Sequence, residues 1–343
     1  MYKITSSEER NEKATEFETK SLLYMMNYYH NSEEIQWFAI DFFNDVTGIN
    51  KFQDTCYDIQ SKGVKNIQPM QLGRYLVTLF KNFISEFNFA EFILFIDSVS
   101  TTIKNEISSN TFVYNDMPQT VKDSIKDGLI DEANKKSYIV DKSKINNKNL
   151  DIFFEKVIFV INDKSKEDYI KDAVNLSDSV IVDNKYLLKI FKEIRDKQSS
   201  KKNNNVEGEI LTSIGCFYKY DKHLTKNEIE DLIINRICFN SALKDLKKVP
   251  KDFAKLIKDI DVTIYDEEIE KSQDAVFRLL SDKNNKKAYW ELFSNIVFCI
   301  KENSNLNLDE IYNNIDKNKI KAVRHLDIIS CKYFISLIKE SIK

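Results

Sequence analysis

The alternation of apolar and polar positions predicts a helix and a hairpin near the start of the chain. Within residues 7–30, apolar side chains recur at helical spacing behind a glutamate-rich first turn. Two segments rich in apolar and aromatic residues, 36–44 and 55–61, are typical of strands. The residues between them include Gly48 and Asn50 and favour a turn. The pattern therefore predicts one helix followed by two paired strands.

The pattern continues with a helix and two buried strands. Pro69 opens a predicted helix over residues 69–87, and the apolar run at 89–99 predicts a buried strand. A second buried strand is predicted within residues 152–162, after a polar and mostly helical stretch. Shorter elements then follow: a helix at 166–176, a short strand at 179–183 and a helix at 184–197. The predicted order from the N-terminus is helix, strand, strand, helix, strand.

A polar stretch suggests where the chain divides. Residues 199–205, with the sequence SSKKNNN, lack apolar anchors and form the clearest linker. We therefore expect two domains, at 1–198 and 206–343. In the second, apolar residues follow helical spacing in the segments 227–239, 286–301, 308–315 and 325–342. The predicted fold class is α+β, with an α/β core followed by a mostly α-helical C-terminal module for regulation, partner docking or assembly.

Composition narrows the class of protein. The chain has 343 residues, of which 42% are apolar and 31% charged, and its six Gly and three Pro favour long helices over a turn-rich all-β fold. Its apolar runs are too short to span a bilayer, and its acidic N-terminus has no signal-peptide core. Five scattered cysteines without C-x-x-C spacing argue against a disulfide scaffold or a structural zinc site. We therefore expect a cytoplasmic protein without a membrane segment.

Candidate chemistry gathers at the open end of the predicted hairpin. Side chains two apart share a strand face, so Asp58, Gln60 and Lys62 project together. The hairpin brings Asp45 beside them, in the pattern Asp45-x14-Gln60-x-Lys62. A carboxylate and an amide carbonyl suit Mg²⁺ or Mn²⁺, which acidifies a bound water and neutralises charge on a phosphodiester, and an ammonium can orient that water. The alternative interpretation is a surface hairpin with ordinary polar residues.

This arrangement resembles the PD-(D/E)xK nuclease superfamily in its QxK variant. Gln60, Ser61 and Lys62 stand for the QxK element and Asp45 for the preceding acid. The predicted element order agrees with the αβββαβ core of the restriction-endonuclease-like fold if one strand is short or merged with its neighbour. Many members carry a glutamate after a phenylalanine on the first helix, and Glu18 after Phe17 looks like that element. Glu16 is an equal competitor, and a solvated glutamate is the alternative.

The segment Asn44-Asp45-Val46 extends the resemblance to the nuclease domains of bacterial antiphage effectors. These include double-strand DNA endonucleases of cyclic-oligonucleotide defence systems and nucleases that assemble with HerA-type ATPases. The resemblance implies Mg²⁺-dependent cleavage of double-stranded DNA with low sequence specificity. Two departures matter: Glu16 replaces the usual glycine, and the C-terminal half does not look like a nucleotide-sensing domain. Control by a partner protein or by oligomerisation is therefore expected rather than control by a cyclic nucleotide.

The resemblance also assigns roles to particular residues. Asp45 and Gln60 would hold the metal ion, with Asp58 as a reserve ligand on the same strand face. Lys62 would position the attacking water, and Glu18 would be a further acidic contributor.

The charge distribution bears on how such a nuclease would hold DNA. Residues 1–100 contain 9 Lys and Arg against 14 Asp and Glu, whereas a protein that holds DNA unaided usually presents a basic face. Lys65 and Arg74 are the expected DNA contacts near the site. We therefore expect a homo-oligomer, or a partner such as a HerA-type ATPase, to strengthen binding. Two alternatives stay open: a catalytically inactive nuclease-fold adaptor, and an RNA-directed nuclease, since reading the 2′-hydroxyl depends on site geometry.

Overall fold

A computed structural model gives the structure of residues 2–4, 12–174, 176, 182–203, 206–244, 249–258 and 265–342. Its contacts form two compact units. The sheet unit comprises residues 1–169 and 191–227, and the helical unit comprises residues 170–190 and 228–343.

This division differs from the boundary that the sequence suggests at residues 199–205. Ser199 and Ser200 end helix α8 (Asn184–Ser200), and Lys201–Asn203 form a 3-10 turn. The chain then returns to the sheet and adds the edge strand β9 (His223–Thr225). A polar, low-complexity stretch can therefore continue a helix when the flanking residues are anchored.

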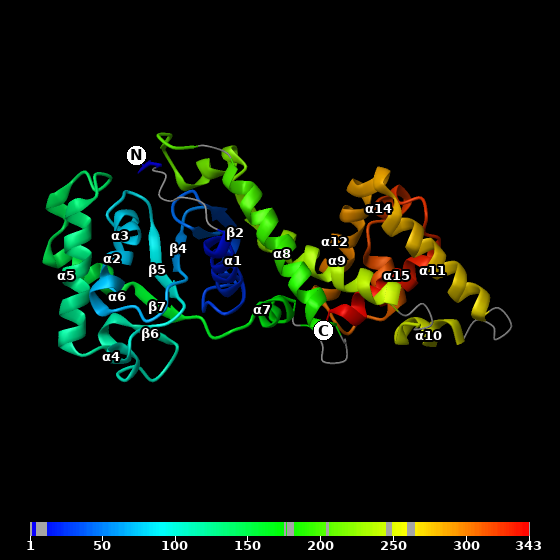
Figure 1. Cartoon of the computed structure of the whole chain (residues 1–343). Coiled ribbons are helices and arrows are strands. Elements are labelled where there is room, and N and C mark those ends of the chain that lie inside the picture. The colour runs from blue at the N-terminus through cyan, green and yellow to red at the C-terminus, as the bar shows by residue number, and fades with distance from the viewer. Residues whose placement is uncertain are drawn as a thin grey trace. The chain divides into compact units, whose positions relative to one another are not determined.

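The centre of the sheet unit is a seven-stranded mixed sheet with the order β6-β7-β5-β4-β3-β2-β9 (Figure 1). Strands β2, β3 and β4 are consecutive and antiparallel, whereas β4, β5 and β7 are parallel. Antiparallel strands β6 and β9 form the two edges. The strand bounds are β2 Ile35–Ile40, β3 Val46–Asn50, β4 Cys56–Lys62, β5 Phe89–Ile96, β6 Thr111–Val113 and β7 Val157–Ile161. A separate two-stranded sheet pairs β1 (Tyr2–Lys3) with β8 (Ile210–Leu211).

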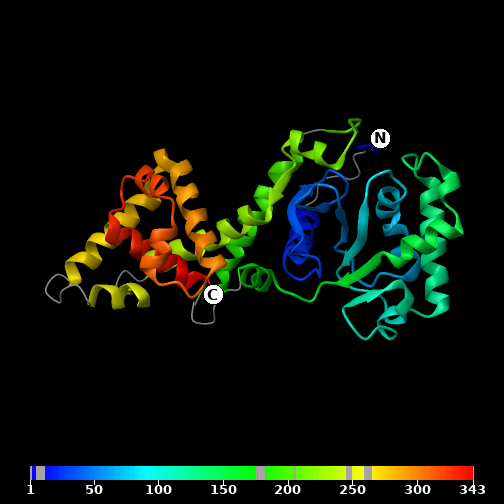
Figure 2. The ribbon, with the colours of Figure 1, turned by 180° about the vertical axis from the view of Figure 1, so that it is seen from behind.

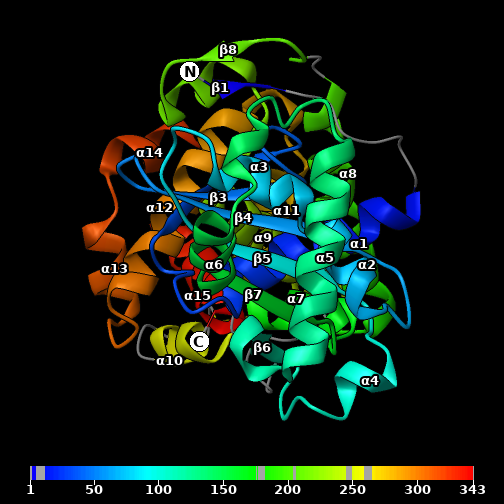
Figure 3. The same ribbon diagram turned by 90° about the vertical axis from the view of Figure 1, so that its left-hand side faces the viewer.

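Helices cover both faces of this sheet. On one face lie α2 (Pro69–Tyr75), α3 (Val77–Phe83) and α6 (Asn147–Glu155), and on the other lies α1 (Glu12–Asn27) (Figure 1). Helix α5 (Gln119–Lys135) lies outermost, across α2 (Figure 3). The two helices meet at glycines, because a Cβ atom at Gly73 would come within 1.9 Å of the Ile125 carbonyl oxygen.

Aromatic side chains fill the space between these layers. On the α3 side, Phe92 of β5 packs against Phe83 and Phe153, with ring centroids 6.1 and 5.3 Å apart. On the α1 side, Phe95 of β5 packs against Phe17, at 5.1 Å. Because successive side chains of a buried strand face opposite layers, β5 reads as one continuous apolar run.

One sequence prediction is wrong in an instructive way. The segment around Gly48, expected to be a turn, is strand β3. A Cβ atom at Gly48 would lie 2.7 Å from the Ile35 side chain and 2.8 Å from the Met25 sulfur, so the glycine permits close packing rather than a turn. The turn follows instead, where Gln53 has a φ of +58° and the Asp54 N–H donates to the Asn50 side chain at 3.1 Å.

Other differences concern the limits of elements. The predicted helix at 69–87 is broken at Leu76 into α2 and α3, and β6 and β9 were not predicted. Residues 7–11 of the first predicted helix, and most of the strand predicted at 179–183, lie outside the described residues.

The helical unit consists of helices in its described part, as the sequence predicts (Figure 2). Helices α10, α11, α12 and α13 all pack on α15, whose Phe334, Ile335 and Ile338 are buried. The helix bounds are α9 Lys226–Lys244, α10 Lys251–Lys258, α11 Tyr265–Ser281, α12 Lys286–Glu302, α13 Leu308–Asn314, α14 Lys317–Ala322 and α15 Ile328–Ser341, and the two short helices of the first half are α4 Thr101–Lys104 and α7 Lys166–Ala173.

The fold is therefore mixed α and β with a helical C-terminal region, which confirms the predicted class at that level. None of the helices in the part of the chain that the structure describes is long and apolar enough to cross a membrane.

Candidate active site

The β3–β4 hairpin brings Asp45 and Gln60 together. Asp45 directly precedes β3, and Val46 pairs with Ile59, so Asp45 lies across from Gln60. The Gln60 amide nitrogen donates to Asp45 Oδ2 at 2.8 Å. The Ser61 N–H and hydroxyl donate to the same oxygen at 2.8 and 2.9 Å. Hydrogen bonds to a carboxylate are strong ones, so this end of the hairpin holds the Asp45 carboxylate in a defined position.

A threonine from helix α3 orients the other end of the Gln60 amide. Thr78 Oγ1 donates to Gln60 Oε1 at 2.7 Å, and the Asn44 side chain donates to Thr78 Oγ1 at 3.3 Å. Sequence reasoning missed Thr78. The available signal is that Thr78 and Asn82 lie one turn apart in a largely apolar helix, so both polar side chains share a face.

Asp58 lies deeper on β4 and has no exposed surface. Thr47 Oγ1 donates to its Oδ1 at 2.7 Å, and the side chains of Asn82 and Asn44 donate to its Oδ2 at 2.6 and 3.4 Å. Burial raises the pKa of the Asp58 carboxyl to about 6, although these hydrogen bonds oppose the shift. The arrangement favours a structural role for Asp58 rather than the reserve ligand that the sequence suggests.

The polar network around Asp58 continues to the start of the chain. The Tyr2 hydroxyl donates to Asn82 Oδ1 at 2.7 Å, and Lys81 Nζ donates to the Tyr2 hydroxyl at 3.1 Å. Burial lowers the pKa of Lys81 to about 8, while the Asp58 charge opposes the shift. Sequence reasoning did not identify this network, because its members come from segments far apart in the chain.

Lys62 ends β4 on the strand face of Gln60, as the alternation predicts. Its Nζ lies 5.8 Å from the centroid of the Tyr75 ring, within the range of a cation–π contact. Asp45, Gln60 and Lys62 therefore all belong to one end of the β3–β4 hairpin.

The two glutamates of helix α1 are both engaged elsewhere. Glu18 is buried and pairs with Lys202, so the solvated interpretation of Glu18 is wrong. Lys166 Nζ lies 2.6 Å from Glu16, and Arg195 Nη1 lies 3.4 Å from it. Among the described residues, neither glutamate makes a hydrogen bond or ion pair with the Asp45 end of the hairpin.

The two expected DNA contacts are exposed. Lys65 follows β4, and Arg74 lies on α2, where its Nη2 is 3.2 Å from Asp131 Oδ2 of α5. Asp131 therefore offsets part of the Arg74 charge, and Lys65 is the less encumbered of the two.

The side chains at this end can be compared with the needs of a metal ion. No group of three or more His, Cys, Asp or Glu side chains in the described part of the chain is placed to hold one. The donors here are instead one carboxylate, one amide and the hydroxyls of Ser61 and Thr78, which are the hard oxygen donors that Mg²⁺ prefers. The amide nitrogen faces Asp45. A half-turn of the amide would present its carbonyl there, and the Thr78 hydroxyl would accept from the nitrogen instead. The set therefore fits Mg²⁺ in donor type.

The comparisons with known proteins add no relative to this geometry. Neither a family model, nor a curated protein, nor a solved structure matches the chain.

Proposed function

We propose that the chain is a metal-dependent nuclease that hydrolyses phosphodiester bonds of DNA at the Asp45 end of the β3–β4 hairpin. The observation that carries the proposal is the strand register. It sets Asp45 opposite Gln60, with 2.8 Å between Oδ2 and Nε2, and places Lys62 two residues further along the strand. A carboxylate, an amide and an ammonium thus share one end of the sheet.

The order of elements supports the likeness to a restriction-endonuclease-like αβββαβ core. Helix α1 precedes the three antiparallel strands β2, β3 and β4, and helices α2 and α3 lead to β5, which is parallel to β4. The third strand stands where the sequence suggested a turn, so no merged strand is needed. The acid precedes the second strand of the three, and the Gln-x-Lys element ends the third.

Each residue has a definite task in this proposal. Asp45 and Gln60 would hold Mg²⁺, which when bound supplies an acidified water and neutralises charge on the phosphate. The Ser61 N–H and hydroxyl keep the Asp45 carboxylate in place, and Thr78 orients Gln60. Lys62 places positive charge where negative charge develops on the phosphate and orients the attacking water.

The biological setting follows from the resemblance alone and is proposed on that basis. The substrate is double-stranded DNA read with little sequence preference, in bacterial antiphage defence. Activity is controlled by oligomerisation or by a partner such as a HerA-type ATPase.

Plasmid cleavage with Mg²⁺ or Mn²⁺ tests the proposal directly. We expect the wild type to nick or linearise the plasmid, and both Asp45→Asn and Lys62→Ala to lose at least about a hundredfold in rate. Asp151→Asn is the matched control, because this exposed carboxylate lies on α6 and its ion pair is with Lys126. Cleavage that survives both site variants would overturn the assignment, and cleavage of RNA but not DNA would change the substrate.

A catalytically inactive adaptor is the second candidate, and one observation favours it. Asp45 is held by Gln60 and Ser61 without any ion, so the fold does not require a metal to satisfy this carboxylate. Thermal unfolding with increasing Mn²⁺ separates the two candidates. A nuclease should show a rise in Tm in the wild type that Asp45→Asn abolishes, whereas an adaptor should show no rise in either.

A further inference from the structure

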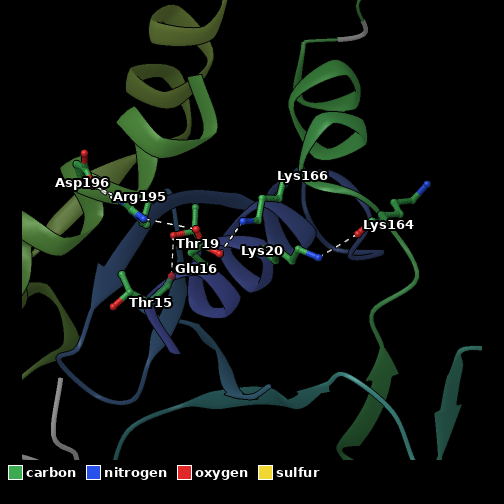
Figure 4. Close-up of polar contacts among 8 residues, drawn as sticks. All are labelled: Thr15, Glu16, Thr19, Lys20, Lys164, Lys166, Arg195 and Asp196. Atoms are coloured by element: carbon green, nitrogen blue, oxygen red, sulfur yellow. Dashed lines mark hydrogen bonds and ion pairs between the residues drawn. The ribbon is translucent and has the colours of Figure 1, made fainter. Parts of the chain in front are cut away.

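Positively charged side chains gather around helix α1 on the side of β7 (Figure 4). The cationic cluster consists of Lys20 on α1, Lys164 and Lys166 after the end of β7, and Lys192 and Arg195 on α8. All of these residues belong to the sheet unit. None of them belongs to the candidate site described above.

The cluster holds more positive than negative charge. Lys166 and Arg195 both pair with Glu16, at 2.6 and 3.4 Å. The hydrogen bond from Lys166 and the charges of Lys166, Arg195 and Lys192 lower the pKa of the Glu16 carboxyl. One carboxylate therefore faces three cations. Arg195 also contacts Asp196, at 2.9 Å, but that side chain is largely exposed.

Lys20 adds a cation that has no carboxylate partner. Its Nζ donates to the main-chain oxygen of Lys164 at 3.2 Å, and within the described ranges it makes no ion pair (Figure 4). Burial and the nearby Lys166 charge both lower the pKa of Lys20. A half-buried ammonium without a counter-ion is costly, so an anion that reached it would be bound favourably.

The cluster is also preorganised. Lys164 Nζ lies 4.5 Å from the centroid of the Tyr28 ring, and Lys166 Nζ lies 5.5 Å from that of Phe191. Such cation–π contacts restrict the lysine side chains and leave N–H groups for another partner. Figure 4 shows the Lys164 amine pointing away from Lys20. Less side-chain entropy is therefore lost when a ligand binds here.

The cluster and the candidate site lie along one edge of the sheet. Strands β4, β5 and β7 are parallel, so their carboxyl ends share an edge. Two main-chain hydrogen bonds join these ends: the Asp97 N–H donates to the Lys62 oxygen at 3.3 Å, and the Asn162 N–H donates to the Ile96 oxygen at 2.8 Å. Two strand spacings amount to about 10 Å. Over about 10 Å of axis, duplex DNA carries on the order of six phosphate charges.

We propose that the cationic cluster binds the phosphate backbone of the DNA that is cleaved at the Asp45 site. The identity of the ligand rests on the proposed function. The fold answers the charge problem seen in the sequence, because it brings basic residues from 164 to 195 onto the acidic first hundred residues. The chain thus supplies part of its own grip on DNA.

Binding of a labelled DNA duplex to the full chain tests this, with fluorescence anisotropy in EDTA between about 50 and 200 mM KCl. The test variant is Lys20→Gln with Lys164→Gln, and the control is Lys135→Gln, an exposed lysine on α5. Losing two phosphate contacts should flatten the slope of log K against log salt by about 1.8 and weaken binding about tenfold or more. Lys135→Gln should match the wild type. Arginine at positions 20 and 164 should retain the slope, which separates lost charge from lost folding.

An unchanged affinity and slope in the double variant would overturn the proposal, as would a wild type that does not bind the duplex at low salt. Tighter binding of an RNA duplex of the same sequence would overturn DNA as the ligand. EDTA keeps this test separate from catalysis. Binding that depends on the cluster without any plasmid cleavage would reject the nuclease and keep the surface, whereas cleavage with unresponsive binding would do the reverse.

Discussion

Asp45 and Asp58 belong to one hairpin, and neighbouring donors hold both carboxylates, but their surroundings differ. Asp45 stands before β3 at the sheet edge, keeps 9% of its surface exposed and accepts hydrogen bonds from Gln60 and Ser61. Asp58 lies in the middle of β4 with no exposed surface and accepts its hydrogen bonds from buried side chains. The number of hydrogen bonds therefore does not distinguish the two acids, whereas access to the edge does.

The difference has a physical basis. A donor lost at the edge can be replaced by water or a metal ion, so the Asp45 carboxylate can exchange partners at modest cost. A donor lost around Asp58 leaves an unsatisfied buried group, so that carboxylate is committed to its neighbours. The edge acid is suited to chemistry, and the interior acid is suited to holding α3 against the sheet.

The largest effect should come from removing the interior acid. Asp58→Ala leaves the donor groups of Thr47 and Asn82 buried without acceptors, so we expect the free energy of unfolding to fall by about 3 kcal/mol. Asp45→Ala should lower it by about 1 kcal/mol, because water can reach the freed donors. Urea unfolding followed by circular dichroism measures both. Equal losses would remove the distinction drawn between the two acids.

A pH series sharpens the same comparison with a smaller effect. Asp58 has a pKa of about 6 in the folded chain, against about 3.9 when unfolded. Between these values the native state binds more protons than the unfolded state, so stability falls as the pH rises. The contribution of protonated Asp58 is complete below about pH 4 and lost above about pH 6.

The matched measurement compares the wild type with Asp58→Asn, which cannot titrate. From about pH 4 to pH 7 the wild type should lose about 2–3 kcal/mol of unfolding free energy relative to this variant. Two parallel stability curves would show that the carboxyl titrates normally and that its burial has little electrostatic effect.

The sequence predicts the hairpin end well, because the argument there is local. Alternation puts Gln60 and Lys62 on one strand face, and the hairpin brings Asp45 opposite Gln60, as the register has it. The roles of these residues stay predictions, since the geometry alone does not establish catalysis. Gly48 misleads a local reading, because its purpose is contact with Ile35 and Met25 from other elements.

Features that depend on distant segments were not predictable in this way. Strand β9 has three residues, and its partner β2 lies far earlier in the chain, so no local pattern announces it. The pairing of Glu18 with Lys202 and of Glu16 with Lys166 likewise needs the tertiary fold. Thr78 is an intermediate case, since its polar character in an apolar helix was visible but its partner was not.

Thr78 provides the smallest and most specific test of the edge site. Thr78→Val keeps the shape of the side chain and removes the hydroxyl that donates to Gln60 Oε1 at 2.7 Å. We expect plasmid cleavage to fall about tenfold, as when the partner of a metal ligand is removed, and stability to fall by about 1 kcal/mol. Cleavage rates at several Mn²⁺ concentrations measure the effect.

A merely structural Thr78 would change stability but leave the dependence on Mn²⁺ unaltered. If Thr78 orients Gln60, the variant should need more Mn²⁺ for half-maximal cleavage, because the amide carbonyl is no longer directed by the hydroxyl. Thr78→Ser retains a hydroxyl and should restore both the metal dependence and most of the rate. A valine variant with wild-type metal dependence would place Gln60 outside the metal site and leave Asp45 as the acid that alone defines the edge.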